Sequence, residues 1–258
     1  MLLIEMTGIP GSGKSTILPI LKTSLRKKGY HVYDSREVFL RKYFSPQHSS
    51  LILAMINLLP RTMEHFFLTL FKRLFVDKIK YVASFFLQRK VLNKLILDTI
   101  FSNGELNSNS KLDLLWWMNL VSIYQFSLMH LKQDEIILLE EGFFHKLITY
   151  FIPTNNKNSA EIKIRNYINL IPEINCLIHI NSNPNVCIRR LKKRNLPRKL
   201  RSKSPSEVLG YLVSADKVIR TGLTNLEANG FSQIVNIDNE HSGFNKDVFL
   251  QSFYNQYH

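Results

Sequence analysis

Residues Gly8–Ser15 read GIPGSGKS and match the pattern G-x-x-x-x-G-K-[ST] at every fixed position. A short apolar run precedes them, and a helix-like segment, Ile17–Lys28, follows and ends before Gly29. Glycines lack a Cβ atom, so backbone N–H groups can converge on a small space, and the first turn of a helix adds further donors and a favourable dipole. The sequence therefore predicts a turn that binds a polyphosphate.

The side chains of this loop have separate expected roles. We expect Lys14 to reach the β- and γ-phosphates of a nucleoside triphosphate such as ATP, and the Ser15 hydroxyl to ligate Mg²⁺. The residues expected to bind the nucleotide are Gly8, Pro10, Gly11, Ser12, Gly13, Lys14, Ser15 and Thr16. The alternative is an ordinary glycine-rich turn between a strand and a helix. The loop by itself indicates a nucleoside triphosphate and no particular reaction.

Five short apolar runs alternate with helix-like segments along the chain. This alternation is typical of a parallel sheet covered by helices on both faces, so the fold class is predicted to be α/β with three layers and a five-stranded parallel sheet. Ligands of such sheets bind beyond the carboxyl ends of the strands. The expected strands are Leu2–Met6, Tyr30–Tyr33, Ile136–Leu139, Cys176–Ile180 and Gln233–Ile237, with a terminal helix after the last.

Acidic residues follow two of these runs. Glu140 and Glu141 come directly after the third run, and we expect one of them to hold Mg²⁺ through water. We assign the metal to Glu140 and the acceptor molecule to Glu141, although strand alternation leaves the reverse assignment open. A solvated strand end is the alternative. His145, three residues after Gly142, is interpreted as a structural histidine rather than an acceptor-facing one.

Asp34 and Arg36 follow the second run. Asp34 is a candidate catalytic residue that would accept the hydroxyl proton of an acceptor, while Arg36 would hold a polar or anionic group. The alternative is a helix N-cap, because Asp34 with Glu37 satisfies part of a capping box. The sequence leaves both interpretations open.

Residues 188–203, IRRLKKRNLPRKLRSK, carry nine Lys and Arg residues and no acid. Without them the formal net charge would be +5 in place of +14. We interpret this stretch as a lid whose arginines offset the charge of a transferred phosphoryl group. The candidates for that role are Arg190, Arg194 and Arg198. A patch that binds nucleic acid or lipid headgroups, and plain solubility, are the alternatives.

Together these features resemble the P-loop nucleotide and small-molecule kinases, in particular the thymidylate-kinase-like group. The matching segments are GIPGSGKST, IILLEEG and NPNVCIRRLKKR. The resemblance implies one P-loop kinase domain over residues 1–258, an ATP donor with Mg²⁺, a lid, and transfer of the γ-phosphoryl group to a hydroxyl or phosphate of a small molecule. Glu-Glu-Gly stands where thymidylate kinases typically have Asp-Arg-Tyr, which argues against a thymidylate acceptor. Asp-Ser-Arg after the second strand is similar to adenylylsulfate kinase and antibiotic phosphotransferases, where an Asp orients the acceptor.

Residues 37–133 contain no convincing strand and are expected to form a long helical insertion rich in large apolar residues. One interpretation is a subdomain with its own core. The other is a cover for a bulky or apolar acceptor, or a surface in peripheral contact with a membrane. Leu114–Leu131 lacks formal charge but contains five polar residues, so we expect a buried helix rather than a membrane span.

Composition narrows the setting and leaves two other functions open. Two cysteines without metal-ligand spacing, and a start without a basic region or cleavage site, predict a cytoplasmic protein without a signal peptide. The net charge of +14 favours anionic partners. One alternative to a small-molecule kinase is a nucleic-acid end kinase or another nucleic-acid-handling ATPase. The other is a nucleotide-binding switch, or a membrane-associated interaction protein, without transfer activity.

Overall fold

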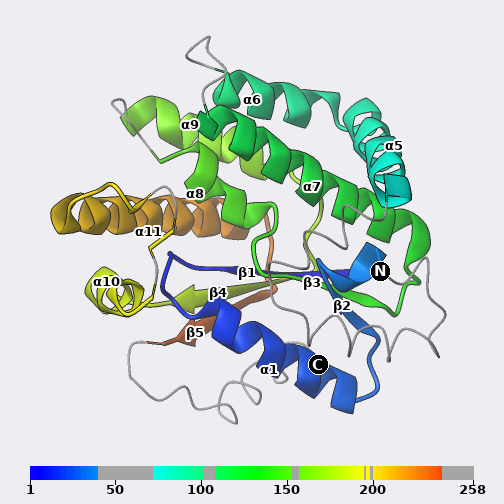
Figure 1. The fold of residues 1–258 in the computed structure, drawn as a ribbon, viewed down its shortest axis with the longest axis horizontal. Coiled ribbons are helices and arrows are strands. Elements are labelled where there is room, and N and C mark those ends of the chain that lie inside the picture. Colours follow the sequence, from blue (N-terminus) through cyan, green and yellow to red (C-terminus); the bar gives the residue numbers. More distant parts are fainter. Residues whose placement is uncertain (40–71, 102–107, 153–156, 195, 198–199, 240–258) are drawn as a thin grey trace. The chain divides into compact units, whose positions relative to one another are not determined.

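The computed structural model describes residues 1–39, 72–101, 108–152, 157–194, 196–197 and 200–239. Its sheet is five-stranded and parallel, with the strand order β2-β3-β1-β4-β5, and it is accompanied by helices (Figure 1). This confirms the predicted α/β fold class with a helical insertion. The strands are β1 (Leu2–Thr7), β2 (Val32–Asp34), β3 (Ile136–Leu139), β4 (Cys176–Asn181) and β5 (Ile234–Asp238).

The helices fall between the strands, as the apolar pattern predicted. They are α1 (Lys14–Lys27), α5 (Lys72–Gln88), α6 (Lys90–Ile100), α7 (Ser108–His130), α8 (Leu147–Tyr150), α9 (Lys157–Ile168), α10 (Pro184–Lys192) and α11 (Pro205–Ala228), with a 3₁₀ turn η1 (Phe144–Lys146). The terminal helix expected after β5 lies outside the described residues, as do Arg198 and residues 40–71 of the insertion.

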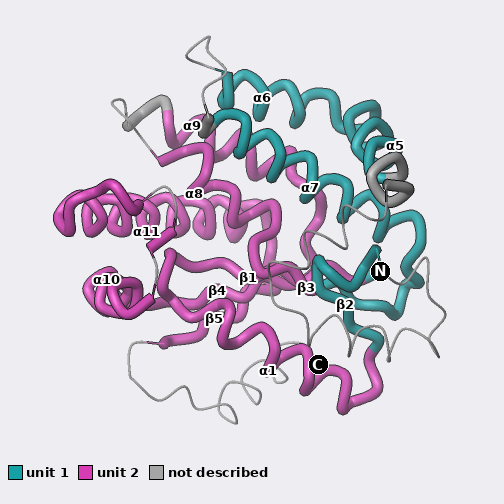
Figure 2. The backbone as a smooth tube through the Cα atoms, viewed as in Figure 1, with its two compact units in different colours: residues 1, 31–137 teal, residues 2–30, 138–258 magenta. Residues whose placement is uncertain are grey.

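The chain divides into two compact units (Figure 2). Unit 2 comprises residues 2–30 and 138–258, and unit 1 comprises residue 1 and residues 31–137. In unit 2, β4 pairs in parallel with β1 and with β5. Helix α1 lies on one side of these strands, and α8, α9 and α11 lie on the other (Figure 1). Both faces of the strands are therefore covered, which explains why β1 and β4 are almost continuously apolar and buried.

Local signals fix where the helices of unit 2 begin. The Asn183 side chain accepts from the backbone N–H of Asn185 at 2.8 Å, and Pro184 occupies the first turn of α10. Helix α11 begins with a capping box, in which Ser204 and Glu207 bind each other's backbone N–H groups. Both devices satisfy donors that the first turn of a helix leaves without an intrahelical partner.

The described helices of unit 1 have an apolar core of their own. Helix α5 packs against α7, where Tyr81, Phe85 and Phe126 are buried. The buried Trp117 indole donates to Asn93 Oδ1 at 3.0 Å, which satisfies its one polar atom. Helix α7 contains most of Leu114–Leu131; residues 120–127 are all buried, and the exposed Leu115 and Met129 lie nearer its ends. Within the described ranges, none of the helices combines the length and apolar character needed to cross a bilayer.

Two glycines of α11 provide a matched test of packing in unit 2. A Cβ atom on Gly222 would lie 2.4 Å from Leu147 Cδ1 and 3.0 Å from the Phe144 ring, whereas one on Gly210 would meet nothing within 4 Å. We expect Gly222→Ala to lower the free energy of unfolding by about 1–3 kcal/mol, because the α8 and η1 side chains must move. Gly210→Ala should raise it by roughly 0.5–1 kcal/mol through helix propensity. Urea denaturation compares the two, and equal stabilisation by both would contradict the packing.

Candidate functional site

The glycine loop of unit 2 joins β1 to α1 and has a backbone that only glycine adopts readily. Gly11 and Gly13 have φ values of 85° and 109°. A Cβ atom on Gly13 would lie 2.4 Å from Asn239 Nδ2, and one on Gly11 would lie 2.8 Å from the Cys187 carbonyl oxygen. The loop therefore packs closely against α10 and the residue after β5. Side chains are excluded from these positions by conformation and by space.

Three donors hold the loop through one carbonyl oxygen. Ser12 O accepts from Asn239 Nδ2 at 2.7 Å, from Arg190 Nη1 at 3.4 Å and from Ser182 Oγ at 3.4 Å. Arg190 Nη2 also donates to the Asn239 carbonyl at 2.8 Å. Arg190, which the sequence suggested for the transferred phosphoryl group, is thus placed against the loop backbone. Asn239 was missed, because a single Asn after a strand carries no recognisable pattern.

Lys14 is buried at the first position of α1. Its Nζ donates to the Gly8 carbonyl at 2.8 Å, so the ammonium group lies across the loop. Burial lowers the pKa of Lys14, and the carboxylates of Glu141 and Glu140 offset part of that effect. The cation is therefore placed within the loop that the sequence predicts to bind phosphate.

Ser15 and Glu140 meet although 125 positions separate them in the chain. The Ser15 hydroxyl donates to Glu140 Oε1, which joins the start of α1 to the end of β3. A hydroxyl and a carboxylate are hard oxygen donors of the kind Mg²⁺ prefers. Among the described residues no cluster of three or more His, Cys, Asp or Glu could hold a metal by itself. The pair fits an ion that is shared with phosphate oxygens.

Glu141 lies beside a buried basic cluster. Its carboxylate oxygens are 3.5 Å from His145 Nε2 and 3.9 Å from Lys146 Nζ, and His145 Nδ1 is 3.4 Å from Thr7 Oγ1. The Glu141 side chain is 52% exposed, whereas His145 and Lys146 are buried. Burial, with Lys14 nearby, lowers the pKa of His145 to about 4, so its imidazole is neutral at pH 7. Partial burial opposes the Glu141 charge, but His145 and the two lysines outweigh it and hold the pKa of that carboxyl well below its usual range.

Glu5 is fully buried in β1 beneath this rim. Its two carboxylate oxygens accept from the backbone N–H groups of Phe143 at 2.8 Å and Phe144 at 2.9 Å. Burial raises the pKa of Glu5 to about 7, against the lowering effect of these two hydrogen bonds and of Lys146. The sequence analysis missed Glu5. The available signal was an acid inside an apolar run that the fold requires to be buried on both faces.

The remaining predicted residues lie in unit 1, after α10, or outside the described residues. In unit 1, Asp34 Oδ1 accepts from the N–H groups of Arg36 at 2.9 Å and Glu37 at 3.1 Å, and Asp34 N donates to Glu37 Oε2 at 3.1 Å. Asp34 therefore forms the capping box that was its alternative interpretation. Arg194 is exposed just after α10, and Arg198 lies outside the described residues.

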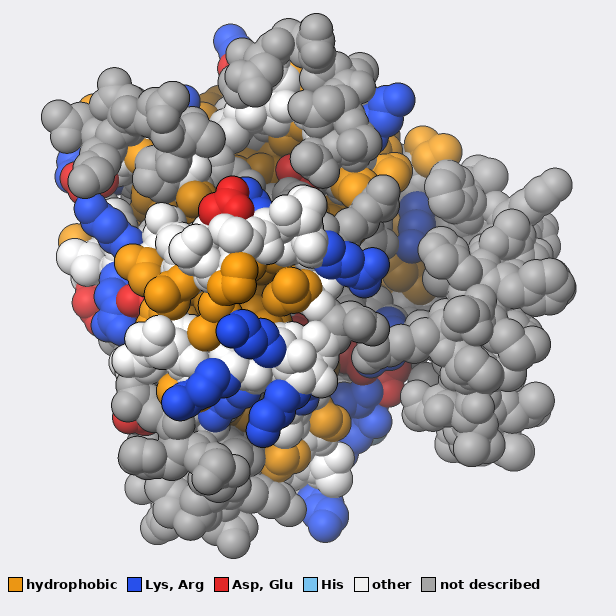
Figure 3. Space-filling model, turned by 60° about the vertical axis from the view of Figure 1, so that its left-hand side comes forward, with side chains coloured by type: hydrophobic (Ala, Val, Ile, Leu, Met, Phe, Trp, Pro, Cys, Tyr) orange, Lys and Arg blue, Asp and Glu red, His pale blue; other side chains and the backbone are white. Residues whose placement is uncertain are grey.

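Basic side chains of the predicted lid are exposed on α10 and in the turn that follows. Figure 3 shows several Lys and Arg side chains close together on one face of the molecule. Arg201 Nε donates to the Leu196 carbonyl at 2.9 Å and so ties part of the turn together. The exposed basic residues are Arg189, Lys192, Lys193, Arg194, Arg201 and Lys203.

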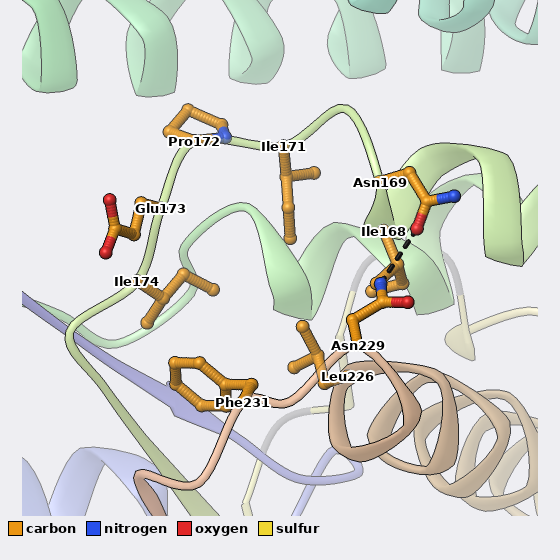
Figure 4. A pocket seen from close by; sticks show the side chains of 9 residues that line it. All are labelled: Ile168, Asn169, Ile171, Pro172, Glu173, Ile174, Leu226, Asn229 and Phe231. Atoms are coloured by element: carbon orange, nitrogen blue, oxygen red, sulfur yellow. Dashed lines mark hydrogen bonds between the residues drawn. The ribbon is translucent and has the colours of Figure 1, made fainter.

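A separate hollow of about 520 Å³ lies before β4 and β5, at the amino ends of these strands (Figure 4). Its lining residues are apolar except for Asn169, Glu173 and Asn229, and Asn229 Nδ2 donates to Asn169 Oδ1 at 2.8 Å. Its lining contains no Lys or Arg. A triphosphate needs positive charge or converging N–H donors, so the glycine loop, and not this hollow, is the candidate site.

Comparisons with solved structures give matches at low sequence identity and with TM-scores below 0.5. No family model and no curated protein matches the chain. Among solved structures, deoxyadenosine kinase from M. mycoides with bound dCTP has a TM-score of 0.45 at 14% identity, covering 98% of this chain and 99% of that one. The same enzyme with bound products has a TM-score of 0.40 at 13% identity, and the match covers 99% of this chain and 98% of that one. TT1252 from Thermus thermophilus has a TM-score of 0.40 at 15% identity, and the match covers 99% of this chain and 97% of that one. All three scores are below 0.5, so they say nothing about the activity of this chain.

The buried acid and the buried imidazole should give opposite pH dependences. The pKa of Glu5 is raised from 4.5 to about 7, so its contribution to stability falls as pH rises through that window. The pKa of His145 is lowered from 6.5 to about 4, so its contribution rises with pH between those values. Each shift corresponds to about 3 kcal/mol, and the two offset each other between about pH 4.5 and 6.5.

We therefore expect Glu5→Gln to make stability rise with pH more steeply than in the wild type, and His145→Gln to make it fall. Urea denaturation at pH 4.5, 5.5, 6.5 and 7.5 measures both slopes. Parallel curves for the wild type and the two variants would contradict the burial of these groups.

Proposed function

We propose that this chain is an ATP- and Mg²⁺-dependent kinase that transfers the γ-phosphoryl group to a hydroxyl or phosphate of a small-molecule acceptor. The observation that carries the proposal is the grouping of Lys14, Ser15 and Glu140 at the glycine loop. The backbone of this loop is held by hydrogen bonds to the Ser12 carbonyl oxygen. In phosphoryl transfer the protein contributes mainly positioning and electrostatic stabilisation, and this grouping supplies the residues for both.

The loop and its lysine would hold the triphosphate. Gly11 and Gly13 have left-handed backbone, and the loop amides are proposed to donate to the phosphate oxygens. Lys14 Nζ, which donates to the Gly8 carbonyl oxygen at 2.8 Å, is proposed to reach the β- and γ-phosphates. Ser12, Pro10 and Thr16 complete the proposed nucleotide-binding set. Because Asn239 and Arg190 hold the Ser12 carbonyl, the loop is pre-organised, and the conformational cost of binding falls.

Ser15 and Glu140 would hold Mg²⁺ at the triphosphate. When bound, the ion neutralises charge on the phosphate oxygens. The protein's own part is to keep the hydroxyl and the carboxylate in contact, as they are in the hydrogen bond from Ser15 Oγ to Glu140 Oε1. That contact supports the assignment of the metal to Glu140, and Glu141 is then available to the acceptor.

On the acceptor side, Glu141, which is half exposed on the rim of unit 2, is proposed to face the acceptor. Asp34 and Arg36, at the end of β2 in unit 1, keep their proposed role of binding an acceptor as a prediction from the sequence. Arg194 and Arg198 are proposed to act from the lid, and Arg190 to support the loop.

A nucleic-acid end kinase is the second candidate. The exposed Lys and Arg residues of α10 and the following turn favour it, because such a cluster neutralises phosphates of a polyanion. This candidate predicts binding that weakens steeply with salt. If these Lys and Arg residues act on a bound nucleotide instead, removing their charge should have little effect on the affinity for DNA or RNA.

Turnover by a Lys14 variant tests the proposal. We expect Lys14→Ala to lower ATP turnover by about 100-fold or more, because a cation beside the transferred group is lost. Lys27→Ala is the matched control, since it removes the same charge from the exposed last turn of α1 and should leave turnover within about twofold. ³¹P NMR follows ATP with a panel of nucleosides, nucleotides, sugars, aminoglycoside-like compounds, lipid alcohols and 5′-hydroxyl oligonucleotides.

Each outcome of that screen bears on the proposal. A new phosphate ester on a small molecule supports it, and phosphorylation of oligonucleotide ends alone favours the second candidate. Tight ATP binding without transfer to any compound would overturn it in favour of a nucleotide-binding switch. Unchanged turnover in Lys14→Ala would overturn the role of Lys14.

A further inference from the structure

We propose that Glu5 is a positioning residue for the acids of the rim. Its buried carboxylate fixes the turn that carries Glu140 and Glu141, and thereby sets how the site takes Mg²⁺ with the nucleotide. The proposal rests on the proposed function, because it gives Glu5 a role in organising the same site. Glu5 itself touches neither the glycine loop nor the proposed metal-holding pair in any contact described above.

The contact is made by both oxygens of one side chain. Glu5 Oε1 accepts from the N–H of Phe143 at 2.8 Å, and Oε2 accepts from the N–H of Phe144 at 2.9 Å. Two buried backbone donors are satisfied by one carboxyl group, and a buried donor left without a partner would be costly. These two fix the position of two successive peptides, and Glu140 lies only three residues before the first of them.

Gly142 shows how closely the turn lies on the carboxyl group. A Cβ atom at this position would be 2.1 Å from Glu5 Cδ and no more than 2.5 Å from either carboxylate oxygen. No larger residue fits there unless the turn moves away from β1. The glycine in Glu-Glu-Gly is therefore explained by the space that Glu5 occupies.

A second hydrogen bond holds the turn, and it does not involve Glu140 or Glu141. The Tyr167 hydroxyl of α9 donates to the Phe143 carbonyl at 2.8 Å. Glu5 holds the N–H side of the turn, and Tyr167 holds a carbonyl on the other side. The turn is thus hydrogen-bonded to β1 and to α9. We infer that these bonds fix the distance between β1, which leads to the glycine loop, and the segment that carries Glu140.

A stability role alone does not account for an acid here. Burying a carboxylate has a desolvation cost, and the same strand position on a covered sheet accepts an apolar residue of similar volume without that cost. The acid accepts two hydrogen bonds from the rim turn, and an apolar side chain could accept neither. Since β1 runs directly into Gly8, Glu5 links the phosphate loop and the metal-holding acid in one rigid piece.

Calorimetric titration of ATP, with and without Mg²⁺, separates this role from a structural one. We expect Glu5→Gln to raise the Mg²⁺ concentration needed for half-maximal enhancement of ATP binding by about tenfold or more, as is found for residues that orient metal ligands. ATP binding without Mg²⁺ should stay within about twofold, because the loop amides and Lys14 are untouched.

Asn175→Ala is the matched control. Asn175 Oδ1 accepts from the N–H of Leu3 at 2.7 Å, so this variant removes a hydrogen bond from the same strand at the end away from the rim. It should lose stability and keep the wild-type Mg²⁺ requirement. If Glu5→Gln and Asn175→Ala behave alike in Mg²⁺ titration, the positioning role is overturned. If the wild type itself binds no ATP, the proposed function fails instead.

Two further measurements keep the proposal testable if Glu5→Gln does not fold. Gly142→Ala forces the turn off the carboxyl group while Glu5 remains, and should reproduce the Mg²⁺ defect. In the wild type, hydrogen exchange at the Phe143 and Phe144 amides should slow further with ATP and Mg²⁺ together than with ATP alone. A wild-type Mg²⁺ requirement in Gly142→Ala, or identical exchange with and without Mg²⁺, would overturn the proposal.

Discussion

The hydrogen bonds that converge on the Ser12 carbonyl oxygen are the constraint on which the site depends. Asn239, Arg190 and Ser182 come from the segments around β4, α10 and β5, and all donate to this one atom. They hold the glycine loop in one shape. Without them a loop of three glycines would have many conformations, and binding a polyphosphate would require ordering it.

A second link ties the same loop to the other side of the sheet. Ser15 contacts Glu140 at the end of β3, and Glu5, in the strand before the loop, holds the amides that follow Gly142. The charged groups of the rim therefore form one network around Lys14. Glu140 and Glu141 offset part of the effect of burial on the pKa of the Lys14 ammonium group, and both acids lie at the rim rather than in the core.

The sequence was most informative where pattern and chemistry are local. Apolar runs located all five strands within a few residues, and the glycine motif located the loop. The strand order β2-β3-β1-β4-β5 was not predictable, because it depends on packing between segments far apart in the chain. The basic stretch was evident from charge, but only the fold shows that Arg190 turns to the loop backbone. Asn239 and Glu5 act through backbone groups that no sequence motif specifies.

The central claim is that this loop binds a triphosphate together with Mg²⁺. Isothermal titration of the folded wild-type chain with ATP tests it most directly, first without Mg²⁺ and then with it. The account predicts one site per chain whose affinity rises when Mg²⁺ is present. Absence of heat and of competition with any purine or pyrimidine triphosphate, under both conditions, would contradict it.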